Sequence, residues 1–247
     1  MKAFKELVIV EFKCFTRNFI NMFFVLIFPA FFLILFGEIY GNDPSPLFDG
    51  QGTIDASVPA YMGMIITVTG IMSLPLALAS YREKKILKRF KATPMSPFHI
   101  LVSQILVNLV MTILGAAILI VVGKVKYDLK FDGNVSTVIL AFLITIICIF
   151  SIGFLIASVV NGTKAANAVA NIIYFPMLFL TGATLPLETM PDNIKDISKF
   201  LPLTHAIEML KGVWKGEAIS NYNNDIVILL VITLICSIIS IKLFRWE

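Results

Sequence analysis

Long apolar runs that carry almost no Asp, Glu, Lys or Arg dominate this sequence. A run of about 20 such residues can cross the hydrocarbon core of a bilayer as an α-helix. Backbone groups in lipid must pair with one another, so only helices and closed barrels span membranes, and continuous runs favour helices. The sequence therefore predicts an all-α membrane protein with six transmembrane helices, at residues 19–37, 58–80, 98–123, 136–160, 166–187 and 226–244.

Charged residues make up 15% of the 247-residue chain, whereas soluble domains carry about 25%. We expect one transmembrane domain over residues 1–247, a retained first span rather than a signal peptide, and no soluble catalytic domain. The three cysteines lie in or beside apolar segments and show no paired spacing, so neither a disulfide framework nor a metal site is expected.

Lys and Arg are distributed unequally between the two sides of the predicted membrane. Thirteen lie on the side of both termini and seven on the other side. The positive-inside rule then places both termini of this multi-pass protein in the cytoplasm.

Three segments lie outside the predicted spans. Residues 1–18 resemble an amphipathic helix that lies along the inner surface, and residues 81–97 form a basic cytoplasmic loop. Residues 188–224 contain prolines, apolar residues and charges, which suggests short outer helices that dip back into the membrane.

No ionisable side chain lies at the centre of a predicted span. Ion-coupled transporters and proton pumps need such groups within the membrane, so energy for transport would have to enter from outside the spans. The sequence also has no Gly-x-x-x-x-Gly-Lys-Ser/Thr phosphate loop. We therefore expect no cofactor in this chain, and a nucleotide-driven machine would require a partner chain.

Two segments carry a resemblance to a known family. Residues 82–97 read REKKILKRFKATPMSP, and residues 180–191 read LTGATLPLETMP, followed by LPLTH at 201–205. They are similar to the charged loop and the outer Ser-Gly-x-x-x-Pro segment of ABC-2 transporter permeases. Lys85 stands where the family often has Gly, Phe90 where Leu is common, and Thr181 where Ser is usual.

This resemblance covers nearly the whole chain and implies a mechanism. Two copies, or one copy and a related permease, would form the pathway of an exporter in the cell (inner) membrane. The exporter would carry drugs, peptides, lipids or glycan precursors. Two ATPase chains, which would bind ATP and Mg²⁺, would dock on its cytoplasmic face. The partners are thus ABC ATPases, a second permease and membrane lipid, with no nucleic acid. The ATPase-coupling residues would be Arg82, Glu83, Lys85, Ile86, Leu87, Arg89, Phe90, Thr93 and Pro94. A loop that only contacts lipid headgroups is the alternative.

The resemblance also favours the second and fifth spans for the pathway and its outer gate. The candidate residues are Thr67, Asn171, Tyr174, Phe175, Gly182 and Pro186. Helix packing is the alternative for the polar residues, and an ordinary helix end is the alternative for the gate.

Two other functions remain open from the sequence. The chain could be an intramembrane enzyme that modifies lipid, with Glu188, Asp192 and Asp196 as its carboxylates, or an accessory subunit without a pathway. His99 and His205 are expected to be interfacial polar residues, because no third metal ligand is evident beside His205 and Glu208.

Overall fold

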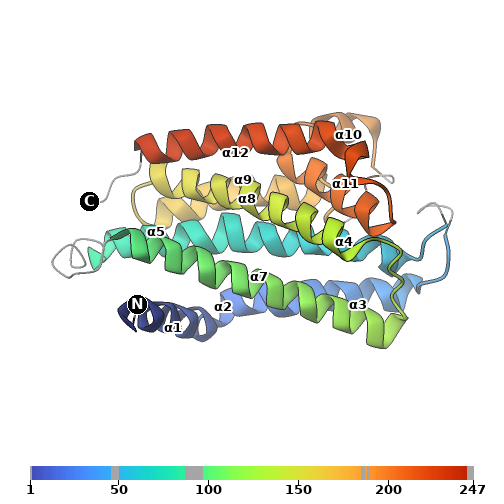
Figure 1. Cartoon of the computed structure of the whole chain (residues 1–247), viewed down its shortest axis with the longest axis horizontal. Helices are drawn as coiled ribbons and strands as arrows, with labels where there is room; N and C mark the ends of the chain where they lie inside the picture. The colour runs from blue at the N-terminus through green and yellow to red at the C-terminus, as the bar shows by residue number, and fades with distance from the viewer. Residues whose placement is uncertain (1, 46–49, 87–96, 185–186, 188–189, 244–247) are drawn as a thin grey trace.

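The computed structural model describes residues 2–45, 50–86, 97–184, 187 and 190–243, and these residues fold almost entirely as helices (Figure 1). Outside the helices, the described ranges hold one isolated antiparallel bridge, between Pro44 and Gly52. The predicted all-α class is therefore confirmed.

The first half of the chain forms a surface helix and three long helices. Their elements are α1 (Lys2–Arg17), α2 (Phe19–Met22), η1 (Phe23–Ile27), α3 (Phe28–Tyr40), α4 (Thr53–Thr67), η3 (Val68–Ser73), α5 (Leu74–Glu83) and α7 (Pro97–Tyr127). α2, η1 and α3 are continuous, as are α4, η3 and α5.

The second half forms three more long helices, with the shorter helices α10 and α11 between the second and third of them. Its elements are α8 (Val135–Val159), α9 (Thr163–Leu180), α10 (Asp192–Ser198), α11 (Pro202–Trp214), η5 (Ile219–Tyr222) and α12 (Asn223–Leu243).

Five helices in the described part of the chain are long and apolar enough to cross a membrane. They are Phe19–Tyr40, Thr53–Glu83, Phe98–Tyr127, Val135–Val159 and Ile219–Leu243. α9, which covers most of the expected fifth span, is not among them; it is 18 residues long and contains Lys164, Asn167 and Asn171. The count of six spans therefore stays a prediction.

Two stretches of π-helix interrupt the long helices, and each lies just before a proline. η1 precedes Pro29 and η3 precedes Pro75. Proline lacks the N–H that would bond the carbonyl four residues earlier, and its ring crowds that carbonyl. The widened turns accommodate this crowding.

The helix Thr53–Glu83 is the centre of the bundle. It is the most buried of the five long helices and contacts α3, α7, α8, α9 and α11. Its closest crossing is with α8, where Gly153 lies against Gly70: a Cβ atom on Gly153 would be 1.9 Å from the Gly70 carbonyl oxygen.

The bundle has two distinct ends. At the end that we call proximal, α1 begins, α5 ends, α7 begins and α12 ends (Figure 1). At the other end, which we call distal, lie α10 and α11 (Figure 1). The proximal end is the one that the distribution of Lys and Arg predicts to be cytoplasmic.

Candidate coupling region and substrate pathway

Three consecutive residues at the proximal end of α5 bind four different neighbours. Tyr81 bonds to α1 and α7, Arg82 bonds to the residue that follows α8, and Glu83 bonds to the first residue of α9. We call Tyr81, Arg82 and Glu83 the α5 clamp. The clamp forms the first three residues of the basic segment 81–97, which was predicted to contact an ATPase.

Glu83 caps α9 from a different helix. Its Oε2 accepts hydrogen bonds from the Thr163 backbone N–H at 2.8 Å and from the Thr163 hydroxyl at 2.7 Å. The residue before α9 is Gly162, which has no side chain to cap the first N–H groups. A carboxylate at a helix N-terminus also complements the helix dipole.

Arg82 binds the other end of the short connection between α8 and α9. Its Nη1 donates to the carbonyl oxygen of Val160 at 3.0 Å, just past the end of α8. Arg82 and Glu83 thus fix the short α8–α9 connection to α5. A guanidinium suits this place because the last carbonyls of a helix lack partners within the helix.

Tyr81 takes part in a buried polar cluster with Glu11 on α1 and Gln104 on α7. Both the Tyr81 hydroxyl and the Gln104 amide donate to Glu11 Oε2, the latter at 2.5 Å. Burial raises the pKa of Glu11 above its usual range, and the two hydrogen bonds oppose that rise. The cluster joins the surface helix to both helices that flank residues 84–96.

A polar row continues from this cluster into the bundle along α7. Asn108 donates to the Gln104 carbonyl at 2.9 Å, and the Thr112 hydroxyl is 2.8 Å from the Thr69 hydroxyl of η3. These α7 residues are buried and face neighbouring helices. Hydrogen bonds between helices are a usual role for such polar faces in membranes.

Glu11→Gln is expected to keep or increase stability at neutral pH. The amide oxygen of Gln can still accept from Tyr81 and Gln104, and no buried charge remains. Because the folded state raises the pKa of Glu11, the wild-type unfolding free energy falls as pH rises from the ordinary Glu pKa through the raised value. Thermal unfolding between pH 4.5 and 8 should therefore show a flatter profile for Glu11→Gln.

Glu11→Ala provides the contrast, because it leaves Tyr81 and Gln104 without their acceptor and should lose about 1–3 kcal/mol. Glu6→Gln, on an exposed position of the same helix, is the matched control and should follow the wild-type profile. A Glu11→Gln variant as unstable as Glu11→Ala would contradict this description.

The predicted coupling residues are only partly within the described ranges. Lys85 follows the helix end and has a φ of +55°. This left-handed conformation explains why the family often has Gly here, since Gly adopts it without a steric penalty. Ile86 is half-buried. The other expected contacts, Leu87, Arg89, Phe90, Thr93 and Pro94, lie outside the described residues.

The candidate pathway residues of α9 point in two directions. Tyr174 is buried at 6% exposure and packs into the bundle, whereas Phe175 is 49% exposed. Asn171 is half-buried and donates to the carbonyl oxygen of Asn167 at 2.8 Å. One face of α9 thus presents Asn167, Asn171 and Phe175 to the outside of the single chain.

The remaining pathway and gate candidates lie on α4 and just past α9. The Thr67 hydroxyl is fully buried and donates to the Gly63 carbonyl within its own helix at 2.7 Å. Gly182 has a φ of +80° directly after α9, and lies in a small pocket with Tyr61 and Lys211. A left-handed glycine at this place ends the helix. Pro186 lies outside the described residues.

Two of the three carboxylates considered for an enzyme lie on α10. Asp192 and Asp196 on α10 are exposed and form ion pairs with Lys195 and Lys199, three residues further on. Glu188 lies outside the described ranges. The two carboxylates that the structure describes point to ordinary surface ion pairs.

Sequence reasoning missed the residues that pair across long distances in the chain. Tyr81, Glu11 and Asp225 were not singled out as candidate functional residues. Asp225 lies 2.7 Å from His205 across 20 residues of sequence. Only the opposite charge and the protonatable ring could have suggested that pair.

Comparisons with known proteins agree with this architecture. The family model described as "ABC-2 type transporter" matches residues 2–213. Among curated proteins, the chain is 23% identical over 189 residues to "Probable multidrug ABC transporter permease YbhR" of Escherichia coli K12, covering 76% of this chain and 51% of that protein.

Two further relatives are named for transport or nodulation. The "Inner membrane transport permease YhhJ" of the same strain is 22% identical over 162 residues, covering 63% of this chain and 43% of that protein. "Nodulation protein J" of Rhizobium leguminosarum bv. viciae is 32% identical over 74 residues, covering 30% and 29%. The chain spans about half the length of the first curated relatives that it matches.

The helices and the family match together make this chain a multi-pass membrane protein. Because the family model covers residues 2–213 of its 247 residues, the chain belongs to the ABC-2 type transporter family.

Proposed function

We propose that this chain is the permease subunit of an ATP-driven exporter, with ATP bound and hydrolysed by separate ATPase chains at the proximal end. The observation that carries the proposal is the α5 clamp. Within three residues, it ties the end of α5 to α1, α7, the α8–α9 connection and α9. A push on the basic segment that follows α5 would reach all of these helices together.

The path from the clamp to the proposed pathway is short. Glu83 holds the first residue of α9, and the same helix carries Asn171 and Phe175 on its outward face. A displacement of α5 would therefore move the α9 N-terminus. The cap is a charge-assisted pair of hydrogen bonds, which is stronger than neutral ones.

The outward face of α9 supports pairing with a second permease. Asn167 and Asn171 are polar and lie on a face that also exposes Ile172, Phe175 and Phe179. Asparagine against acyl chains is unfavourable, whereas it is common between helices or along a cavity. We infer that a second copy, or a related permease, covers this face and that the pathway runs between the two.

An amphipathic substrate fits the composition of this face. Phe175 and Phe179 supply apolar area, their rings stack at a centroid distance of 6.3 Å, and the two asparagines supply hydrogen-bonding groups. The word multidrug in the name of one relative is in accord with this class of substrate.

The test is reconstitution in inverted vesicles. The chain would be purified alone and together with the ABC ATPase chains that we expect to co-purify with it. We expect no ATP hydrolysis by the chain alone, and ATP-dependent movement of a fluorescent amphipathic dye by the complex. Hydrolysis by the isolated chain, or dye movement without ATP, would contradict the proposal.

A further inference from the structure

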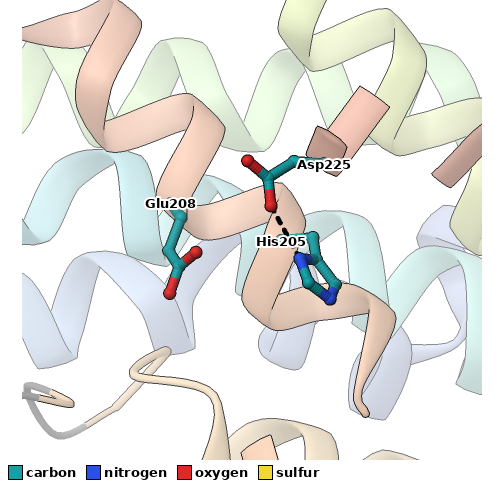
Figure 2. Close-up of side chains that lie close together, drawn as sticks. All are labelled: His205, Glu208 and Asp225. Carbon is teal, nitrogen blue, oxygen red and sulfur yellow. Dashed lines mark hydrogen bonds and ion pairs between the residues drawn. The ribbon is translucent and has the colours of Figure 1, made fainter. Parts of the chain in front are cut away.

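A histidine near the distal end has both ring nitrogens fixed by oxygen atoms. His205, in the first turn of α11, has Nε2 2.9 Å from the backbone carbonyl oxygen of Lys199. Its Nδ1 is 2.7 Å from Oδ1 of Asp225, in the first turn of α12 (Figure 2). The His205 and Asp225 side chains are 14% and 17% exposed, so water reaches the pair only in part.

The carbonyl of Lys199 determines which nitrogen carries hydrogen. A carbonyl oxygen can only accept, so Nε2 must be the donor. In the neutral ring, Nδ1 then bears a lone pair that faces the lone pairs of the Asp225 carboxylate. The two atoms are 2.7 Å apart, which is a hydrogen-bond distance when a proton lies between them, and a metal ion bound to both would lie to one side of the line that joins them.

Glu208 supplies a third ligand on the same side. It lies one helical turn after His205 on α11, and one ligand atom from each of His205, Glu208 and Asp225 lies within 4.8 Å of the others (Figure 2). A histidine whose second N–H is held by a backbone carbonyl is the usual arrangement of an imidazole metal ligand.

We propose that His205, Glu208 and Asp225 bind a divalent metal ion of the zinc type. One imidazole nitrogen and two carboxylate oxygens are ligands that Zn²⁺ accepts, and three protein ligands leave a coordination position open. Because Asp225 is on α12 and the other two are on α11, the ion would fasten these helices together. The proposal does not depend on the proposed transport function.

The surroundings of Glu208 contain cations as well as acids. Lys211, Lys215 and Glu217 line the same cavity as Glu208. These ammonium groups would compete with the metal for the Glu208 carboxylate.

The direct test is metal titration of the full-length chain in nanodiscs after removal of metals with a chelator. ZnCl₂ should raise the Tm of the wild type, whereas MgCl₂ at the same concentration should not. CoCl₂ should give the visible absorption bands of Co²⁺ with nitrogen and oxygen ligands. Asp225→Asn and Glu208→Gln should each weaken Zn²⁺ binding by about tenfold or more, since each removes one of three ligands.

Asp192→Asn is the matched control, because this exposed carboxylate lies on α10, outside the cluster, and should leave Zn²⁺ binding unchanged. If Zn²⁺ leaves the Tm unchanged and Co²⁺ gives no bands, the cation between His205 and Asp225 is a proton and the proposal is overturned. It is also overturned if Glu208→Gln binds Zn²⁺ as tightly as the wild type.

Discussion

Gly153→Ala is expected to prevent stable assembly of the bundle. The new Cβ would be 1.9 Å from the Gly70 carbonyl oxygen, which is backbone and cannot rotate away. α8 and η3 would have to separate, which would expose the packed surface between them. Overpacking of this severity costs about 3 kcal/mol or more. The measurement is the unfolding free energy in detergent micelles, together with the amount of folded protein in the membrane fraction.

Gly123→Ala on α7 is the matched control. Its Cβ would be 3.2 Å from Leu129 Cδ2, the flexible end of a side chain, so a small rotation relieves the contact. Both substitutions replace glycine by alanine in a helix, which by itself favours the helix by up to about 1 kcal/mol. We expect the unfolding free energy of Gly123→Ala to be near that of the wild type and that of Gly153→Ala to be much lower. Equal stability of the two variants would show that α8 and η3 do not approach each other this closely.

Glu83→Ala is expected to separate ATP hydrolysis from transport in the reconstituted complex. It removes both acceptor contacts to Thr163 and leaves α9 without a side-chain cap. These contacts are exposed, so their loss leaves the packed interior of the bundle intact. The force that α5 delivers to α9 would be lost, so we expect transport to fall by about tenfold while ATPase activity persists. Transport and hydrolysis would be measured on the same vesicles.

Two variants define the effect of Glu83→Ala. Thr163→Val removes the hydroxyl contact but keeps the backbone N–H contact, so it should give an intermediate ratio of transport to hydrolysis. Glu6→Gln removes an exposed carboxylate at the same end of the bundle and should match the wild type. A Glu83→Ala complex that transports and hydrolyses like the wild type would refute the role of the clamp.

The helical class was predictable because burial in lipid leaves a signal along the sequence itself. Charge-free runs give the positions of the long helices. The same rule gives helix ends less well: α4 begins at Thr53 rather than near residue 58, because Asp55 is buried within it. Its Oδ1 accepts from the Asn42 amide at 3.1 Å and from the Lys130 backbone N–H at 2.9 Å. A charge with such partners does not mark the end of a helix.

The α5 clamp was not predictable, because its contacts join residues far apart in sequence. Glu83 and Thr163 are 80 positions apart, and Glu11 and Gln104 are 93 apart. Periodicity reports which face of one helix is buried, but it does not report which other helix covers that face. Arg82 and Glu83 are predicted to contact an ATPase, which stays a prediction, and within this chain they also bind the connection between α8 and α9.

Lys85, in the coupling segment, has a backbone conformation that the sequence of this chain does not indicate. The sequence showed Lys85 at a place where the family often has glycine, and the structure gives that residue a φ of +55°. A Gly at this position would have indicated such a left-handed turn, whereas the Lys of this chain does not.

Photo-cross-linking tests whether the ATPase chains dock on the basic segment at the proximal end. A photoreactive amino acid would replace Phe90 in one variant and Phe200 in another, in cells that also produce the co-purifying ATPase. Phe200 is 87% exposed near the distal end, which the distribution of Lys and Arg predicts to lie outside the cell. We expect a cross-link to the ATPase from position 90 and none from position 200. A cross-link from position 200, or none from position 90, would contradict docking of the ATPase on the basic segment.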